Sequence, residues 1–394
     1  MVKGIGIFCV LFEHIVPDGG MVKPVIYSSH MPLFFIVTGV FYYKERRTLM
    51  EILKDSKIAE TVGNSTFLIT GSTGMIGQNI VKLLLRYNDE FGTNIRVIGH
   101  ARNAEKYKKI YESMLHRNDL CSCFCDVTAL NISEKVDYIV HTASITGGSK
   151  QHIDYPMRTI GTSIDGARAA LEMAREQKVK GIVFLSSLEV YGNTGQDKKY
   201  ITEEDGGYID PMNVRSSYSE GKRICECMFS AYAKQYGIPA TVARLTASFG
   251  HGVSYRDNRV FAQFAKSILD HKDIILKSTG ETVRDYCDTE DVARALLILL
   301  INGVPGNAYN VANMKTEISI RKLAERFIEL YPESGSKLVF DLSEDATKFG
   351  YNKIMRNVLD SNKLQNLGWY PKYNIDDMII HLIESMKSSE ERES

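Results

Sequence analysis

A tyrosine and a lysine, Tyr218 and Lys222, stand four residues apart and could handle a proton together. Residues at this spacing share one face of a helix, so both side chains can reach the same substrate group. A phenol titrates near pH ~10 in water and acts as a base at neutral pH only where a nearby cation stabilises the phenolate. Lys222 is placed to do this, and Ser187, at the end of an apolar run, can hydrogen-bond the same hydroxyl. The alternative is an ordinary pair on a surface helix.

Elements on either side must bring these residues to one edge of the fold. Ser216 or Ser217 is expected to cap the helix that carries Tyr218. Apolar runs predict strands that alternate with helices. The strands are expected over 64–70, 95–99, 136–144, 181–186 and 240–245, with another ending at Asp126 and Val127, and the helices over 79–86 and 163–177. This alternation predicts an α/β fold, a Rossmann-type doubly wound parallel sheet whose ligands bind at the carboxyl ends of the strands.

A glycine-rich turn, Gly71-x-x-Gly74-x-x-Gly77, joins the first of these strands to the first helix of the sheet. Glycines let the backbone approach a pyrophosphate closely, and the helix N-terminus adds amide donors and a partial positive charge. Strand, turn and helix follow one another in the order that a dinucleotide fingerprint needs. We therefore predict a dinucleotide site whose contacts include Gly71, Thr73, Gly74, Met75, Ile76 and Gly77.

Composition narrows the class of protein. The chain has 394 residues, enough for two domains, and 48 basic and 48 acidic residues. The formal net charge of zero shows no overall excess of positive charge of the kind that binds nucleic acid, so no such partner is expected. Seven cysteines without Cys-x-x-Cys spacing favour reduced thiols in a cytoplasmic protein without a metal site, and zinc binding is the alternative. The alternating Cys121, Cys123 and Cys125 have the period of a strand and are expected to pack on one face.

Three regions are expected along the chain. Residues 1–47 form an apolar N-terminal segment, residues 48–250 the dinucleotide-binding domain, and residues 251–394 a smaller α/β lobe that covers the site. An amphipathic helix is expected over 48–59. In the last region, helices are expected over 260–269, 290–301 and 318–331, and a strand over 274–277.

The N-terminal segment differs in character from the rest. Its two apolar runs, 4–16 and 31–43, are each shorter than the ~20 residues of a spanning helix. No basic leader precedes the first run, which makes it a poor secretory signal, and basic residues follow the second, as at a cytoplasmic membrane boundary. Residues 3–39 resemble the opening of the acyltransferase-3 family of membrane enzymes that acylate sugars. The further spans of that family are absent, so the resemblance implies a remnant or an anchor with membrane contact.

The remaining motifs stand in the order and spacing of another family. The glycine turn, Asp126-Val127, His141-Thr142-Ala143, the run from Ser186 to Gly192 and Tyr218-x-x-x-Lys222 together resemble an extended short-chain dehydrogenase/reductase across residues 64–385. They resemble its NAD-dependent epimerase/dehydratase branch, whose members act on nucleotide sugars. Segments 215–226, 257–260 and 280–286 are similar to UDP-glucuronate decarboxylases. The resemblance implies NAD as cofactor, held also by Asp126, Val127, Thr142, Ala143, Tyr218 and Lys222.

The resemblance also implies roles for the residues that opened this section. Tyr218 would take the proton of the sugar's 4-hydroxyl while NAD takes the hydride from C4, Lys222 would hold the nicotinamide ribose and lower the pKa of Tyr218, and Ser187 would position the hydroxyl. The product is a 4-keto sugar, from which family members diverge.

Two residues after Ser187 bear on which reaction follows. A 4,6-dehydratase uses consecutive Asp and Glu there, whereas this chain has Leu188 and Glu189, which disfavours dehydration. A decarboxylase needs less, because a β-keto acid loses carbon dioxide once the ketone is formed, and Glu189 stands where those enzymes carry a glutamate. A 4-epimerase would not require Glu189. We favour the decarboxylase slightly; the alternative for Glu189 is a solvated loop carboxylate or a partner of a nearby lysine.

Four arginines are expected to bind substrate, and a fifth departs from the family pattern at the cofactor site. Arg284 and Arg356, and less strongly Arg215 and Arg259, are expected to bind substrate, since a guanidinium fork suits a diphosphate. At the end of the second strand, where NAD users carry an acidic residue, this chain has Arg102, so NADP is an alternative cofactor.

Partners follow from the same resemblance. A nucleotide-sugar substrate is expected, and also a homodimer through a bundle formed by the helices that carry Ser163 and Tyr218. Outside enzymes, the competing hypothesis is a non-catalytic dinucleotide-binding module that senses redox state. The Ser187, Tyr218 and Lys222 group argues against it, because a sensor has no use for a base beside the nicotinamide.

Overall fold

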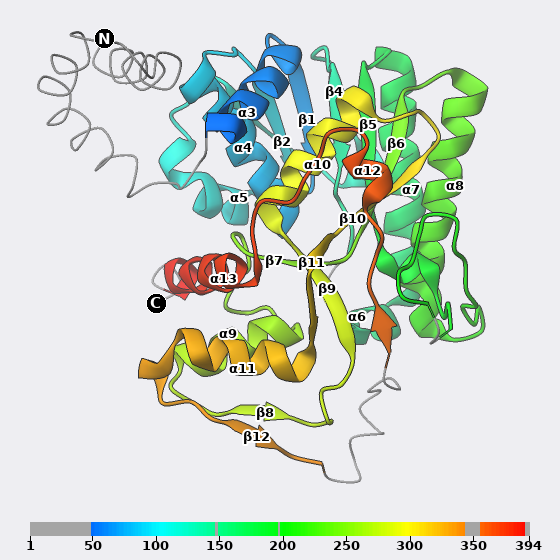
Figure 1. The fold of residues 1–394 in the computed structure, drawn as a ribbon. Helices are drawn as coiled ribbons and strands as arrows, with labels where there is room; N and C mark the ends of the chain where they lie inside the picture. The colour runs from blue at the N-terminus through cyan, green and yellow to red at the C-terminus, as the bar shows by residue number, and fades with distance from the viewer. Residues whose placement is uncertain (1–48, 146–148, 196–197, 343–354, 391–394) are drawn as a thin grey trace, which may run out of the picture. The chain divides into compact units, whose positions relative to one another are not determined.

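The computed structural model describes residues 49–145, 149–195, 198–342 and 355–390 (Figure 1). The chain divides into two compact units, 1–57 and 58–394, and the second carries the fold described below. Helix α3 (Leu49–Val62) spans this division. The apolar N-terminal segment lies outside the described residues. Within the described ranges, none of the helices combines the length and apolar character that crossing a bilayer requires.

Seven parallel strands form the main sheet, and their order reverses beside the first strand. The order is β3-β2-β1-β4-β5-β6-β10, and every neighbouring pair is parallel. The strands are β1 (Thr66–Thr70), β2 (Arg96–Ala101), β3 (Leu120–Phe124), β4 (Tyr138–His141), β5 (Gly181–Ser187), β6 (Ala240–Leu245) and β10 (Ala308–Val311). Because the order reverses between β1 and β4, a crevice for ligands is expected at the carboxyl ends of these strands.

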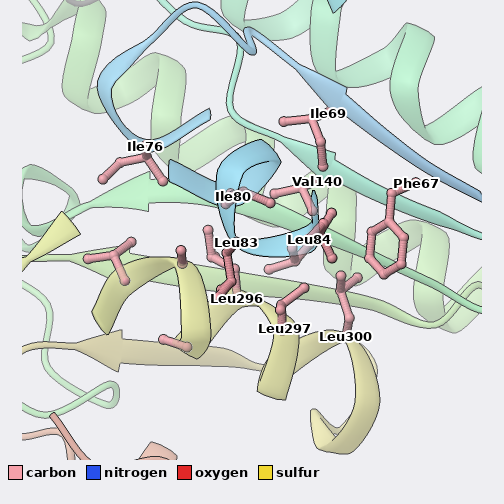
Figure 2. Close-up of a cluster of buried hydrophobic side chains, with 14 of the residues drawn as sticks. Phe67, Ile69, Ile76, Ile80, Leu83, Leu84, Val140, Leu296, Leu297 and Leu300 are labelled. Carbon is pink, nitrogen blue, oxygen red and sulfur yellow. The ribbon is translucent and has the colours of Figure 1, made fainter. Parts of the chain in front are cut away.

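Helices cover both faces of this sheet, as the nearly continuous burial of successive residues along β1, β2 and β4 requires. Phe67 and Ile69 of β1 pack with α4 (Met75–Phe91) and α10 (Thr289–Asn302), as Figure 2 shows. Leu68, between them, faces α7 (Pro156–Gln177) and α8 (Ser217–Tyr236) on the other side. Two short helices, α5 (Ala104–Tyr111) and α6 (Ser149–Asp154), complete this part. The predicted Rossmann-type α/β fold is confirmed.

A second group of elements follows β6 and has its own core. Strand β9 pairs with β7, β11 and β13, and β8 pairs in parallel with β12. The strands are β7 (Ala247–Phe249), β8 (Ile274–Leu276), β9 (Val283–Asp288), β11 (Asn313–Ser319), β12 (Leu338–Phe340) and β13 (Arg356–Asn357), and the helices are α9 (Val260–Leu269), α11 (Ile320–Leu330) and α13 (Ile375–Glu390). Helix α12 (Asn362–Gln365) instead contributes Leu364 to the core of the main sheet.

The chain crosses between the two groups after residue 250. Helix α10 and strand β10 lie within the predicted C-terminal lobe by sequence, yet α10 packs on the main sheet and β10 pairs with β6. The boundaries at 47 and 250 therefore stay predictions about domains, while the main sheet draws its last strand from beyond residue 250. At the opposite edge of the main sheet from β10, Cys121 and Cys123 of β3 pack together against the α7 side of the core, as predicted. Cys125 follows the strand.

Candidate active site

Strand β5 ends at the edge of the sheet where the predicted catalytic residues gather. Ser187 is its last residue, and a 3-10 turn, Leu188–Tyr191, begins immediately after it. The Ser187 hydroxyl accepts a hydrogen bond from the backbone N–H of Glu189 at 3.2 Å, which caps this turn. The cap fixes Glu189 next to the serine, and both side chains are half-buried.

Helix α8 presents Tyr218 and Lys222 from one face, as predicted, but its N-terminus lacks the predicted serine cap. The prediction that Ser216 or Ser217 caps the helix is wrong, because both hydroxyls donate elsewhere, to the carbonyl oxygens of Asp210 at 2.6 Å and His152 at 3.3 Å. A 3-10 turn, Val214–Ser216, runs directly into α8. Asn213 caps this turn by accepting from the N–H of Arg215 at 3.0 Å.

Polar contacts spaced one helical turn apart fix α8 against β5. Lys222 Nζ donates to the carbonyl oxygen of Leu185 at 2.6 Å. One turn later, Glu226 accepts from the Ser186 hydroxyl at 2.5 Å and from Arg244 of β6, whose Nη2 lies 2.7 Å from the carboxylate. Sequence reasoning did not assign Ser186, Glu226 or Arg244 to the site. The signal for Glu226 was its position eight residues after Tyr218, on the same helical face.

The phenol of Tyr218 is surrounded by predicted site residues. Removal from water raises the pKa of Tyr218 to about 12, and the charge of Glu189 adds to this effect. The Ser187 side chain, through a hydrogen bond, and the charges of Arg215 and Arg259 act in the opposite direction. The structure therefore brings these four residues around the phenol. It adds His152, whose ring centroid lies 4.6 Å from that of Tyr218 and for which the sequence gave no signal.

Lys222 is buried beneath this group, with 3 % of its surface exposed. Burial lowers the pKa of Lys222 to about 8, and nearby Cys225 and Glu226 oppose the shift. Its ammonium lies 5.8 Å from the centroid of the Tyr218 ring and 4.6 Å from that of Phe184. A lysine with a pKa lowered to about 8 and a phenol with a pKa raised to about 12 thus share one face of α8. The predicted action of Lys222 on the phenol remains a prediction.

Glu189 is held between two donors beside the phenol. Its Oε1 accepts from Arg215 Nη2 at 2.9 Å, and its Oε2 accepts from the Ser219 hydroxyl at 3.1 Å. The side chains of Glu189 and Arg215 are 36 % and 29 % exposed, so the pair borders solvent. Glu189 is therefore neither a free loop carboxylate nor the partner of a lysine. Leu188 before it packs against a small apolar cluster.

The glycine turn between β1 and α4 suits a dinucleotide. Gly71 has φ 69°, and a Cβ there would lie 2.9 Å from the backbone nitrogen of Ala143. A Cβ on Gly77 would lie 2.4 Å from the carbonyl oxygen of Gly71. Gly74 is exposed and stands at the N-cap of α4 without a side-chain cap, which leaves the first amides of a long helix open to an anion.

The ends of the neighbouring strands complete the predicted dinucleotide site. The Thr142 hydroxyl donates to the carbonyl oxygen of Thr70 at 2.6 Å, and the Ala143 N–H donates to the Thr70 hydroxyl at 3.3 Å. After β3, Asp126 caps the 3-10 turn Val127–Ala129. All predicted cofactor contacts of the turn and of these strand ends thus lie at the carboxyl edge of the sheet. Thr73 lies in the turn, and Met75 and Ile76 are the first residues of α4.

The predicted substrate arginines fall into two groups. Arg259 Nη2 lies 2.6 Å from Asp257 Oδ2 and 3.2 Å from Met75 Sδ, beside the glycine turn, and with Arg215 it acts on the Tyr218 phenol. Arg284 and Arg356 instead lie on adjacent strands of the second sheet, β9 and β13. Arg356 Nη1 lies 2.6 Å from Glu317, so this guanidinium already has a carboxylate partner.

The described residues contain no group of three or more His, Cys, Asp or Glu side chains placed to hold a metal ion. The six cysteines of this part of the chain are free thiols.

Comparisons with known proteins agree with this geometry. The family model described as the NAD dependent epimerase/dehydratase family matches residues 67–312. The chain is 26% identical over 313 residues to a dTDP-D-glucose 4,6-dehydratase of Bos taurus, covering 77% of this chain and 84% of that protein. It is 28% identical over 327 residues to UDP-glucuronic acid decarboxylase 6 of Arabidopsis thaliana, covering 82% and 88%. A dTDP-glucose 4,6-dehydratase of Bacillus anthracis, solved in complex with NAD, has a similar fold, with TM-score 0.68, 20% identity and coverage of 83% and 98%.

Proposed function

The chain belongs to the NAD-dependent epimerase/dehydratase family, and from this premise we propose that it modifies a nucleotide sugar through a 4-keto intermediate, in the manner of a UDP-glucuronate decarboxylase. The observation that carries the proposal is the meeting of Ser187, Glu189 and Tyr218 at the carboxyl end of β5, with Arg215 paired to the glutamate.

The chain's own residues supply binding and proton transfer. Bound NAD would accept the C4 hydrogen as a hydride, with its electron pair, and return it later. Tyr218 takes the proton of the 4-hydroxyl, and Ser187 orients that hydroxyl toward the phenol. Because burial raises the pKa of Tyr218 to about 12, the phenol needs positive charge nearby before it gives up its own proton. Lys222, Arg215 and Arg259 are the cations placed to provide it.

Decarboxylation is favoured over the two other reactions of the family by the residues that follow Ser187. Elimination of water needs an acid where this chain has the apolar Leu188, so a 4,6-dehydratase is the least favoured alternative. A nucleotide-sugar 4-epimerase is the main alternative, since it asks nothing of Glu189. Glu189 stands where decarboxylases carry a glutamate, and its ion pair with Arg215 at 2.9 Å fixes it beside the phenol, which supports the decarboxylase.

Further proposals concern assembly and location. We propose a homodimer through α7 and α8; α8 exposes apolar Ile224 and Tyr236, at 42% and 47% of their surfaces. We also propose that catalysis takes place in the cytoplasm and that residues 1–47 provide membrane contact. Sedimentation with and without membranes, for the full chain and for a chain that begins near Thr48, tests both statements. Equal partition of the two chains would contradict the membrane contact.

One experiment separates the reactions. The purified chain is checked for bound NAD by absorbance and incubated with UDP-, dTDP-, GDP- and CDP-sugars while product mass is followed. Loss of carbon dioxide from UDP-glucuronate is the expected result. Loss of water would indicate a dehydratase, and an unchanged mass with altered chromatography would indicate an epimerase. No change with any sugar would leave the non-catalytic dinucleotide-binding module.

A further inference from the structure

We infer that the dinucleotide site accepts a 2′-phosphorylated cofactor, NADP, at least as well as NAD, and that Arg102 receives the 2′-phosphate. The inference concerns cofactor choice at the adenosine end of the site. It does not depend on which sugar is the substrate, and it departs from the cofactor in the family's description.

The end of β2 lacks the group that selects NAD. In dinucleotide-binding folds, an acidic residue about twenty positions after the glycine turn usually holds the adenosine ribose hydroxyls. Here β2 ends at Ala101, and Arg102 and Asn103 follow it, both exposed. No carboxylate stands at this strand end.

Neighbouring polar side chains are already committed. The His100 ring is buried, with Nδ1 accepting from the Gly71 N–H at 3.4 Å and Nε2 3.1 Å from the carbonyl oxygen of Cys125. Asn103 uses its side-chain oxygen to accept from the Lys106 N–H at 2.8 Å, which caps α5. The ribose hydroxyls would therefore meet no free acceptor from His100 or from the Asn103 oxygen.

The nearby carboxylates also have partners. Asp126 Oδ1 accepts from the backbone N–H and the hydroxyl of Thr128, at 3.0 and 2.9 Å. Glu105, in the first turn of α5, pairs with Lys108 at 3.1 Å. Neither carboxylate is paired with Arg102, which has no hydrogen bond or ion pair to any of the residues that the structure describes.

Arg102 adds a positive charge close to this corner of the site. It lies close enough to His100, beneath the glycine turn, and to Asp126, after β3, to influence the titration of both. Those residues flank the two strand ends between which an adenosine would lie. A guanidinium presents a planar fork of donors that matches phosphate oxygens, so an exposed and unpaired arginine at this position favours a 2′-phosphate over a 2′-hydroxyl.

Binding measured on the full chain tests the inference without turnover. Titration calorimetry with NAD, NADP, 5′-AMP and 2′,5′-ADP is expected to show NADP binding at least as tightly as NAD, and 2′,5′-ADP binding more tightly than 5′-AMP. Added salt should weaken the phosphorylated ligands more than the others. A charge-assisted contact of this kind predicts that Arg102→Ala weakens NADP and 2′,5′-ADP by about tenfold to a hundredfold, with NAD changed less than about twofold.

Two further variants make the result decisive. Arg102→Asp should reverse the preference toward NAD, and Arg321→Ala, which removes an exposed arginine from α11 in the other sheet group, should change neither affinity. The inference is overturned if NAD binds the original chain about tenfold or more tightly than NADP, or if Arg102→Ala weakens both ligands equally. Failure of every sugar to react would overturn the proposed function and leave these binding results standing.

Discussion

Two clusters of polar side chains in the described part of the chain can be compared, because each contains residues with shifted pKa values: Tyr218 and Lys222 in one, and Glu290, Asp291 and His381 in the other. Of these two clusters, the first borders solvent and the second is buried. The first is the Tyr218 group, formed by Ser187, Glu189, Tyr218 and Lys222 at the end of β5. The second, which we term the α10 cluster, consists of Asp288, Glu290 and Asp291 at the start of α10 with their partners on α13 and the segment before it.

Each carboxylate of the α10 cluster is matched inside the fold. Asp288 accepts from the Glu290 N–H at 2.7 Å and from His381 at 2.9 Å. Glu290 accepts from the Tyr373 hydroxyl at 2.7 Å and pairs with Arg86 and Arg294. The Asp291 carboxylate accepts from the Tyr373 N–H at 3.0 Å.

The comparison separates a folding role from a chemical one. Burial raises the pKa of Asp291 to about 7, a shift as large as any at the candidate site, yet Asp291 is fully buried. Ser187, Glu189 and Tyr218 are half-buried at the sheet edge, where a ligand can arrive. A shifted pKa therefore points to function only where the group can also meet a substrate.

Replacement of Tyr218 and of Tyr373 by phenylalanine should have opposite effects on kcat and Tm. The largest effect is expected for Tyr218→Phe. Loss of the acid–base hydroxyl is expected to lower kcat by about a hundredfold to ten-thousandfold with little change in Tm. Tyr373→Phe should leave kcat nearly unchanged and lower Tm, because Glu290 loses a buried donor. Steady-state kinetics and calorimetry of both variants check this. Full turnover by Tyr218→Phe would remove the catalytic assignment.

Removal of a carboxylate should cost more stability in the α10 cluster than at the site. Glu290→Ala is expected to lower the free energy of unfolding by about 3–5 kcal/mol, because the half-buried Arg86 and the buried Arg294 lose their shared partner. Glu189→Ala removes a half-exposed ion pair and should cost less than about 1 kcal/mol. Urea unfolding of the two variants measures the difference. Equal losses would mean that Glu189 is a structural residue like Glu290.

Replacement of Glu189 by an uncharged residue of similar shape tests how its charge affects Tyr218. The charge of Glu189 raises the pKa of Tyr218, so Glu189→Gln should lower that pKa. The base must be deprotonated to act, so activity rises with pH, and the rising limb of the pH–rate profile should move to lower pH by roughly one unit. Comparison with Glu220→Gln on the same helix controls for a general loss of charge. An unmoved limb would contradict the assignment.

The smallest effect is expected from the pH dependence of the α10 cluster. Burial lowers the pKa of His381, but the hydrogen bond and charge of Asp288 outweigh it, and the net shift is upward. Stability from this contact is therefore fully present below pH ~6.5, the ordinary pKa of histidine, and is lost as pH rises through the raised pKa. The free energies of unfolding of the original chain and of His381→Gln should differ by less than about 2 kcal/mol at pH 6. The two values should converge at pH 9. A constant difference would show that the ion pair is not the cause.

Six of the seven strands of the main sheet were predicted from the sequence because their signals are local, whereas β10 was not. Strand β6, and helix α9 of the second group, begin and end at the predicted residues, since each is a short segment rich in apolar residues. The glycine turn was also found, because its Gly-x-x-Gly-x-x-Gly spacing can be read directly from the sequence. Helix α7 begins at Pro156, earlier than predicted, since its first turns are only partly buried and their apolar pattern is weak.

Features that depend on distant contacts could not be predicted. Ile318 was placed at the start of a helix, but it lies in β11, which pairs with β9, and Ser319 caps α11 by accepting from the Lys322 N–H at 3.2 Å. The partner of Glu189 proved to be Arg215 because two separate 3-10 turns bring them together. The assignment of Ser216 or Ser217 as a cap failed for the same reason, since distant carbonyl oxygens attract both hydroxyls.

The late position of β10 in the chain has a consequence for biosynthesis. Ala308 pairs with Val242 and Val311 with Leu245, so the edge of β6 has no partner until the chain has been made well beyond the Tyr218 helix. An emerging chain that ends before β10 exposes an apolar, unpaired strand edge, which is the kind of surface that pairs with other chains. We therefore expect chains that end between β6 and β10 to aggregate rather than to accumulate as a smaller folded protein.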